Sequence, residues 1–226
     1  MITKLEPIKL LEVRFGTPIR YEQLSKFRGA IIHTTKQIND LFHNHNGENV
    51  IYRYPQIQYK RINGKAAILC LGEGVEAIHD FFSNYNGEIM LGQESIELKV
   101  EKIKAHRHTL NVWDRVFSYR LANWLPLNQE NYLAYRNAAN YSTKMQILEN
   151  VLIGNLLTFC QSVDDSFSMQ IRVEIVRVVS DKVIRYKGQL MQAFDLDIQT
   201  NLSLPDQIGI GKGTSLGFGV ITRKWE

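Results

Sequence analysis

The sequence predicts an α+β fold of two tandem ferredoxin-like domains, the second of which lacks one helix. The first half of the chain has the pattern strand, helix, strand, strand, helix, strand, and the second half repeats this order without the second helix. A glycine-rich stretch at residues 209–219 stands before the last predicted strand, where the missing helix would lie. At 226 residues the chain is long enough for two domains of ordinary size.

The first half of the chain supplies one complete set of elements. Residues 21–43, YEQLSKFRGAIIHTTKQINDLFH, place Leu24, Phe27, Ile31 and Ile38 on one side, which predicts a long amphipathic helix. The stretch HNHNGEN then ends this helix. The other elements are expected as a strand at 8–15, strands at 50–62 and 66–72 around an NGK turn, a helix at 74–85 and a strand at 95–106.

The second half begins in the same way but then departs from the pattern. We expect a strand at 116–127, one long helix or a broken pair at 128–163, strands at 169–179 and 183–199 joined by the turn SDK, and a last strand at 218–225. The match between the halves lies in the element order and not in the sequence. We place the boundary between residues 115 and 116, which gives an N-terminal domain 1–115 and a degenerate C-terminal domain 116–226.

The composition is that of an ordinary globular protein with a mildly basic charge. A net charge of +4 and a pI near 9.0 permit a polyanionic partner. The opening MITKLEPIKL lacks the apolar core of a signal peptide, and the longest apolar stretch, NVLIGNLLTFC, is too short to cross a bilayer. Cys70 and Cys160 sit in apolar runs, so we expect buried thiols in a reducing cytoplasm and no membrane contact.

The stretch GIGKGTSLGFG at residues 209–219 holds five of the chain's 15 glycines, at a cost in conformational entropy. A phosphate-binding P-loop is excluded because Gly213 follows Lys212 and because Asp206 stands at the first glycine position. A Rossmann motif is excluded because Thr214 stands at its third glycine. A plain turn and an RNA-binding loop remain, and we favour RNA because a turn alone does not require this pattern.

The spacing G-I-G, five residues, G-F-G resembles the glycine-rich signature of the RAMP superfamily of CRISPR-associated RNA-binding proteins. The string SLGFGV is similar to the version in the repeat-RNA processing endoribonuclease, the sixth Cas family. The resemblance implies a double ferredoxin-like architecture. Glycines let a main chain approach phosphates, and successive N–H groups can bind an anion. We therefore expect RNA contacts from Gly209, Gly211, Lys212, Gly213, Ser215, Gly217 and Gly219.

The histidines of the first half suggest a second function for this region. The polar face of the first predicted helix carries Lys26, Gly29, His33, Lys36, Asp40 and His43. His33 and His43 are therefore not expected in the core, although a solvated polar face would explain His33 equally well. We do not favour a metal site, because neither His43 with His45 nor His106 with His108 has a carboxylate or cysteine at ligand spacing.

Histidine, tyrosine and lysine side chains suit metal-free RNA cleavage, in which a base activates the ribose 2′-hydroxyl and an acid protonates the leaving 5′-oxygen. Two histidines with pKa values near about 6.5 can divide these roles, each worth about 10²- to 10⁴-fold. A lysine stabilises the extra charge on phosphorus. The resemblance implies His43, His45, Tyr52 and Lys36 as catalytic residues, since some members of the family carry a His-x-His pair followed by Tyr. His33 is an alternative to one of them, and the base and the acid are not assigned.

The predicted hairpin of the second half is basic. Residues 171–188 carry a local net charge of +3. Such charges often protect an edge strand, but in the resembled family a hairpin of the second domain cradles the repeat RNA. We expect RNA contacts from Arg172, Arg177, Lys182, Arg185 and Lys187.

The resemblance as a whole implies a metal-independent endoribonuclease that cuts CRISPR precursor RNA within its repeats. Its products would carry a 2′,3′-cyclic phosphate and a 5′-hydroxyl, and no cofactor is expected. Its partners would be the repeat RNA and subunits of a CRISPR interference complex; monomer and homodimer both stay open. The alternative is a RAMP-type subunit that binds guide RNA without cutting it. An enzyme acting on a small molecule would leave the glycine pattern unexplained.

Overall fold

The computed structural model describes residues 7–35, 40–42, 54–164 and 167–225, together with the backbone of residues 45–46 and 49–50. The chain forms two compact units. The N-terminal unit extends to His108 and also includes Ser215–Gly217, and the C-terminal unit comprises Thr109–Thr214 and the chain from Phe218 onward. The predicted boundary between residues 115 and 116 lies within one continuous strand, a few residues after the division between the units.

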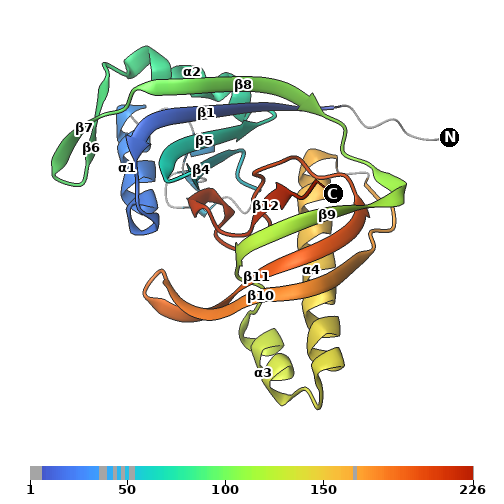
Figure 1. Ribbon diagram of the computed structural model, residues 1–226. Coiled ribbons are helices and arrows are strands. Elements are labelled where there is room, and N and C mark those ends of the chain that lie inside the picture. Colours follow the sequence, from blue (N-terminus) through green and yellow to red (C-terminus); the bar gives the residue numbers. More distant parts are fainter. Residues whose placement is uncertain are drawn as a thin grey trace. The chain divides into compact units, whose positions relative to one another are not determined.

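The N-terminal unit has a four-stranded antiparallel sheet with two helices (Figure 1). The strand order is β4-β5-β1-β8. The strands are β1 (Ile8–Pro18), β4 (Ile57–Ile62), β5 (Lys65–Leu71) and β8 (Val100–His108), and the helices are α1 (Leu24–Thr34) and α2 (Gly74–Asn84). Both helices share one core with the sheet, in which the Phe27 ring of α1 lies 5.9 Å from the Tyr59 ring of β4.

The helix α1 ends earlier than the sequence predicts. It stops at Thr34 instead of continuing to residue 43. The Thr34 hydroxyl donates to the Ala30 carbonyl at 3.0 Å and the Thr35 hydroxyl to the Ile32 carbonyl at 2.7 Å. Such bonds compete with the helical pattern, and β-branched side chains are poor helix formers, so the two threonines weaken the helix where it ends. Residues 40–42 form a short 3₁₀ turn, in which Phe42 returns to the core.

Two small hairpins of this unit are absent from the predicted set. One joins β2 (His45–Asn46) to β3 (Asn49–Val50), and the other joins β6 (Glu88–Leu91) to β7 (Glu94–Glu97). The second hairpin divides the strand expected at 95–106 into β7 and β8. Pro55 explains why the strand expected from residue 50 begins at Ile57, since proline interrupts strand pairing.

The C-terminal unit repeats this architecture with the strand order β10-β11-β9-β12. Its strands are β9 (Val112–Trp124), β10 (Val173–Tyr186), β11 (Gln189–Leu202) and β12 (Val220–Arg223). The expected helical region is a broken pair, α3 (Gln129–Asn137) and α4 (Tyr141–Val163), and α4 runs along one face of the sheet (Figure 1). The side chains of Asn128 and Asn140 accept hydrogen bonds from the backbone N–H groups of Asn131 and Thr143, so each helix starts at an asparagine cap.

The hairpin of β10 and β11 turns later than predicted. The turn expected at Ser180-Asp181-Lys182 is wrong, because β10 continues through these residues to Tyr186. The chain turns instead at Lys187 and Gly188, which have φ angles of 48° and 81°. Two successive positive φ angles are typical of a type I′ two-residue hairpin turn, and glycine adopts such angles readily.

The predicted fold class is confirmed. In both sheets the strands lie in the order second, third, first and fourth along the chain, which is the ferredoxin-like order. Between β11 and β12 the described residues hold a loop with a 3₁₀ turn, Thr214–Leu216, in place of the second helix. Cys70 and Cys160 are free and buried as expected, and burial raises the pKa of both thiols. No helix in the described part of the chain is long and apolar enough to cross a membrane.

Candidate nucleic-acid interface

The glycine-rich stretch folds back so that its two G-h-G halves lie side by side. Gly209 forms an antiparallel bridge with Val220, and the Ile210 N–H donates to the Gly219 carbonyl at 2.8 Å. A Cβ atom on Gly219 would lie 1.9 Å from the Ile210 carbonyl oxygen, and its φ angle is 61°. The backbones of the two G-h-G halves approach each other too closely for a side chain at Gly219. Their pairing therefore requires glycine at this position.

The middle of the stretch is packed equally tightly. A Cβ atom on Gly211 would lie 2.5 Å from the Asn155 Oδ1 atom of α4, and one on Gly213 would lie 3.0 Å from the rings of Phe218 and Tyr186. Gly217, which belongs to the N-terminal unit, would place a Cβ atom 2.9 Å from Leu24 Cδ1. Contacts within the protein thus account for much of the glycine pattern.

The exposed groups of this loop are the ones available to a ligand. Lys212 is exposed, whereas Gly213 and Ser215 are half-buried and Gly209 and Gly219 are buried. RNA contacts from the buried glycines would have to use the backbone only. That the loop binds RNA stays a prediction, and Lys212 is its strongest candidate contact.

The structure brings the glycine-rich loop to the tip of the β10–β11 hairpin. The Tyr186 ring stands edge-on to the Phe218 ring, with 5.2 Å between their centroids. Lys212 lines a cavity of about 480 Å³ together with Val183 and Gln189 of the hairpin and the start of α3. Arg185 and Lys187 are exposed beside this tip. The loop and the hairpin tip, which lie apart in the sequence, therefore lie side by side in the C-terminal unit, and both carry exposed cations.

Other hairpin cations are held by carboxylates of β11. Arg177 contacts the Asp197 carboxylate at 2.7 Å, and Lys182 contacts Asp195 at 2.8 Å. Asp197 also accepts a hydrogen bond from Arg120 at 2.6 Å and lies 3.2 Å from the Lys224 ammonium. Burial alone would raise the pKa of Asp197, but hydrogen bonds from Arg120, Arg177 and Lys224 hold this pKa below its ordinary value.

This group of three cations around one carboxylate, which we call the Asp197 cluster, carries a net charge of +2. Arg177 remains 62% exposed at its side chain and Lys224 44%, so both keep N–H groups for an anion. Neither Arg120 nor Lys224 is indicated by the sequence pattern. Arg120 belongs to β9 and Lys224 directly follows β12, and only the pairing of the four strands brings them to Asp197. Arg172 precedes β10 and is exposed, and its backbone N–H donates to Asn201.

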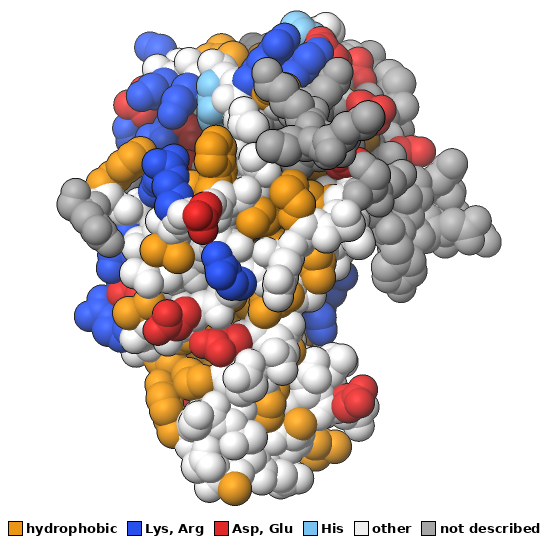
Figure 2. Space-filling view, turned by 90° about the vertical axis from the view of Figure 1, so that its right-hand side faces the viewer, with side chains coloured by type: hydrophobic (Ala, Val, Ile, Leu, Met, Phe, Trp, Pro, Cys, Tyr) orange, Lys and Arg blue, Asp and Glu red, His pale blue; other side chains and the backbone are white. Residues whose placement is uncertain are grey.

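The pair of helices in this unit shows the opposite character. On the face drawn in Figure 2, the surface over α3 and α4 carries few charged side chains. The two helices contain only a handful of charged residues in their sequence. With so few charged side chains, the helix pair is a weaker candidate for phosphate contacts than the sheet, the hairpin and the loop.

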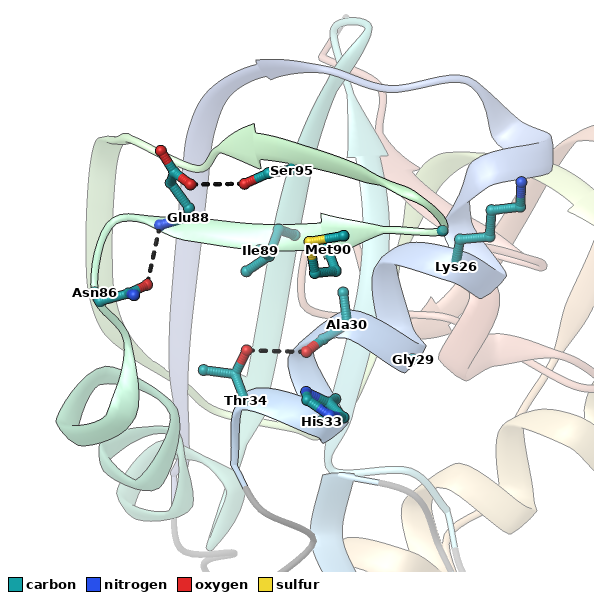
Figure 3. Close-up of a pocket in the computed structure, with 11 residues that line it drawn as sticks. Lys26, Gly29, Ala30, His33, Thr34, Asn86, Glu88, Ile89, Met90 and Ser95 are labelled. Carbon is teal, nitrogen blue, oxygen red and sulfur yellow. Dashed lines mark hydrogen bonds between the residues drawn. The ribbon is translucent and has the colours of Figure 1, made fainter.

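A second candidate region lies in the N-terminal unit, where α1 faces the β6–β7 hairpin (Figure 3). The two elements enclose a cavity of about 620 Å³, lined by Lys26, Gly29 and His33 of the helix and by Glu88 and Ser95 of the hairpin. The Ser95 hydroxyl donates to Glu88 at 2.6 Å. His33 is exposed, as the helical spacing predicted, and it opens onto this cavity.

The structure says less about the predicted catalytic residues. Lys36, His43 and Tyr52 lie outside the described residues. The backbone of His45 forms β2, where it pairs with Val50 of β3. Because α1 ends at Thr34, helical spacing no longer relates His33 to Lys36 and His43. The catalytic assignment therefore stays a prediction.

Models of the Cas6b N-terminal domain and of the Cas6b C-terminal domain match residues 6–109 and 111–224. The chain belongs to the Cas6b family. A crystal structure of Cas6b resembles it with a TM-score of 0.88 and 23% identity, covering 97% of this chain and 100% of the other. A crystal structure of the CRISPR RNA processing endoribonuclease Cas6b has the same coverage, a TM-score of 0.74 and 22% identity.

A further relative comes from Methanocaldococcus jannaschii, the uncharacterized protein MJ0978. It is 28% identical over 145 residues, which cover 61% of this chain and 97% of that protein. The solved structures establish the fold, and the two domain models establish the family. Together they confirm the tandem ferredoxin-like architecture and the resemblance that the glycine spacing suggested.

Proposed function

We propose that this Cas6b-family chain is an endoribonuclease that cuts CRISPR repeat RNA without a metal ion and leaves a 2′,3′-cyclic phosphate and a 5′-hydroxyl. The observation that carries the proposal is the pair of Cas6b domain models, which together match residues 6–109 and 111–224. One of the related solved structures is described as a CRISPR RNA processing endoribonuclease. The repeat RNA is the proposed partner, and a CRISPR interference complex is the proposed recipient of its product.

The proposed chemistry belongs to the N-terminal unit. His43 and His45 divide the roles of base and acid, Lys36 stabilises the phosphorane charge, and Tyr52 assists; His33 is the alternative histidine. One backbone feature supports this assignment. β2 and β3 pair His45 with Val50, and Tyr52 follows Val50 by two positions in the sequence. We propose that His45 and Tyr52 act on the same phosphate.

The proposed RNA-binding residues lie in the C-terminal unit. Lys212 of the glycine-rich loop and Arg185 and Lys187 of the hairpin tip supply exposed cations, and Lys212 lines a cavity together with hairpin residues. The Asp197 cluster adds Arg177 and Lys224, whose orientation is fixed by the buried carboxylate. Cations held in place lose little freedom when a phosphate binds, which favours affinity.

The proposal is tested with end-labelled repeat RNA incubated with the protein in EDTA, followed by analysis of the product ends. We expect cleavage to a 2′,3′-cyclic phosphate, and we expect the double variant His43→Ala/His45→Ala to bind the RNA without cutting it. Cleavage that requires an added divalent ion would overturn the mechanism. Binding of repeat RNA by the unmodified protein, with no cleavage under any condition, would make it a guide-RNA-binding subunit.

A further inference from the structure

Aromatic rings and arginine side chains alternate along β9 and β12 of the C-terminal unit. The Arg115 guanidinium lies 5.4 Å from the centroid of the Trp113 ring and 4.8 Å from that of Phe117. The Arg223 guanidinium lies 4.8 Å from Phe117 and 4.7 Å from Trp225. The order Trp113, Arg115, Phe117, Arg223, Trp225 is therefore one continuous stack, which we call the arginine–tryptophan ladder.

The centre of the ladder is built into the fold. Arg223 pairs with Tyr119 across β12 and β9, and Phe117 is only 4% exposed. The backbone N–H of Arg223 donates to Asp206 at 3.0 Å, which fixes the end of β12. The position of both guanidinium groups is thus set by a buried ring between them, and little side-chain entropy is left to lose.

The two ends of the ladder are open to solvent. Trp113 is 40% exposed and Trp225 is 82% exposed. Tryptophan has the largest apolar side chain, so these two rings present a large apolar surface to solvent. Each terminal ring contacts one arginine, and its exposed surface is available for a further planar group.

Two cations lie beside one open end. Trp225 lines a cavity of about 480 Å³ together with Arg177 and Lys224 of the Asp197 cluster. A ligand that stacks on Trp225 therefore has two exposed cations within the same cavity. A planar ring linked to an anionic phosphate has this combination of properties, and an unpaired nucleotide is such a group.

We propose that the arginine–tryptophan ladder binds unpaired nucleotides of RNA, with bases stacked on Trp113 and Trp225 and phosphates held by the ladder arginines, Arg177 and Lys224. The proposal rests on the proposed function insofar as the RNA is the repeat transcript. It assigns contacts to residues that neither the glycine-rich loop nor the hairpin tip includes.

The test uses the intrinsic fluorescence of the protein and a short single-stranded 2′-O-methyl oligoadenylate, which cannot be cleaved through a 2′-hydroxyl. The chain has three tryptophans, and the third, Trp124, is buried and donates to Asn155 at 3.0 Å, so it serves as an internal reference. We expect the oligonucleotide to quench the emission of the native protein. Trp225→Ala and Trp113→Ala should each weaken binding about tenfold.

The matched control is Tyr141→Ala, which removes a 66% exposed ring from the start of α4 and should leave the affinity unchanged. Circular dichroism checks that each variant is folded. Unchanged tryptophan emission on RNA binding, or equal affinities for the native protein and both tryptophan variants, would overturn the proposal and leave a protein as the occupant. Failure to cut repeat RNA with quenching intact would overturn the endoribonuclease and not the ladder.

Discussion

The two units share one strand order but differ in the partners that surround a buried charged group. In the C-terminal unit the buried carboxylate of Asp197 is surrounded by three cations. In the N-terminal unit Lys60 of β4 is 1% exposed, and within the described residues its ammonium has no hydrogen-bond partner. Burial lowers the pKa of Lys60 from 10.5 to about 7. The same topology thus accommodates a buried carboxylate with cationic partners and, within the described residues, a buried ammonium without a hydrogen-bond partner. The buried ammonium should lower the free energy of unfolding at neutral pH.

The units also differ in their second crossover connection. The N-terminal unit has α2 there, whereas the C-terminal unit has the glycine-rich loop. A helix satisfies its own backbone groups, but the loop depends on close backbone contacts between residues far apart in the motif. The loop should therefore tolerate substitution much less than the helices do.

The largest effect is expected for Gly219→Ala. Its new methyl group would meet the Ile210 carbonyl, so we expect the free energy of unfolding to fall by about 4 kcal/mol or more. The matched control is Gly154→Ala within α4, where no atom lies within 4 Å of the added Cβ. It should raise stability by about 0.5–1 kcal/mol. Urea unfolding of both variants measures the difference, and equal stabilities would show that the loop backbone can relax.

The next effect concerns the buried ammonium of Lys60. Lys60→Met should raise the free energy of unfolding on the order of 3 kcal/mol at pH 7, because the native protein no longer has to bury an ammonium. Between the native pKa near 7 and the ordinary 10.5 the unfolded chain binds more protons, so native stability rises with pH in this window. The advantage of the variant should therefore shrink from pH 7 to pH 10. A gain independent of pH would contradict the buried ammonium.

Asp197→Asn removes the carboxylate that three cations share and should lower the free energy of unfolding. We expect a loss of about 1–2 kcal/mol at pH 7, because three cations lose their shared carboxylate, although their own exposure limits the effect. Because the native pKa of Asp197 lies below the ordinary 3.8, its stabilising effect is fully present above pH 3.8 and decreases below that pH. The difference between native protein and variant should vanish as the pH falls through the native pKa. Glu174→Gln, at an exposed position of β10, is the control for loss of one charge.

A smaller effect separates the helices of the two units. Asn140→Ala removes the side-chain cap of α4 and should cost about 1 kcal/mol. The corresponding residue before α2, Glu73, makes no side-chain capping bond. Glu73→Ala should therefore change stability by only a few tenths of a kcal/mol. Thermal unfolding of the pair checks this difference, and equal losses would mean that the asparagine cap is unimportant.

The sequence predicted most elements because their patterns are local. Short apolar runs predicted β1, β5, β9 and β12 near their observed positions, whereas the sequence left open whether residues 128–163 form one helix or the pair α3 and α4. The end of α1 was wrong because hydroxyl-to-carbonyl bonds at Thr34 and Thr35 decide it, and spacing does not reveal them. The hairpin turn was wrong because SDK has turn-forming residues, while the positive φ angles fall at Lys187 and Gly188. The sequence pattern does not reveal the Asp197 cluster, since its members lie on β9, β10 and β11 and directly after β12.

The glycine spacing shows both the strength and the limit of sequence patterns. It identified the family correctly, and the domain models confirm it. The physical reason for the spacing is the pairing of the two halves of the motif, Gly209 with Val220 and Ile210 with Gly219, which only the folded loop reveals.

The central claim is that the N-terminal unit cuts RNA and the C-terminal unit holds it. Single-turnover cleavage and equilibrium binding of repeat RNA in EDTA test it with two sets of variants. His43→Ala/His45→Ala should lose cleavage and keep the native affinity. Lys212→Ala/Lys187→Ala should bind more weakly and become more weakly dependent on salt, yet cut at the native rate once RNA is saturating. If both sets change affinity and saturating rate together, the division of labour between the two units is contradicted.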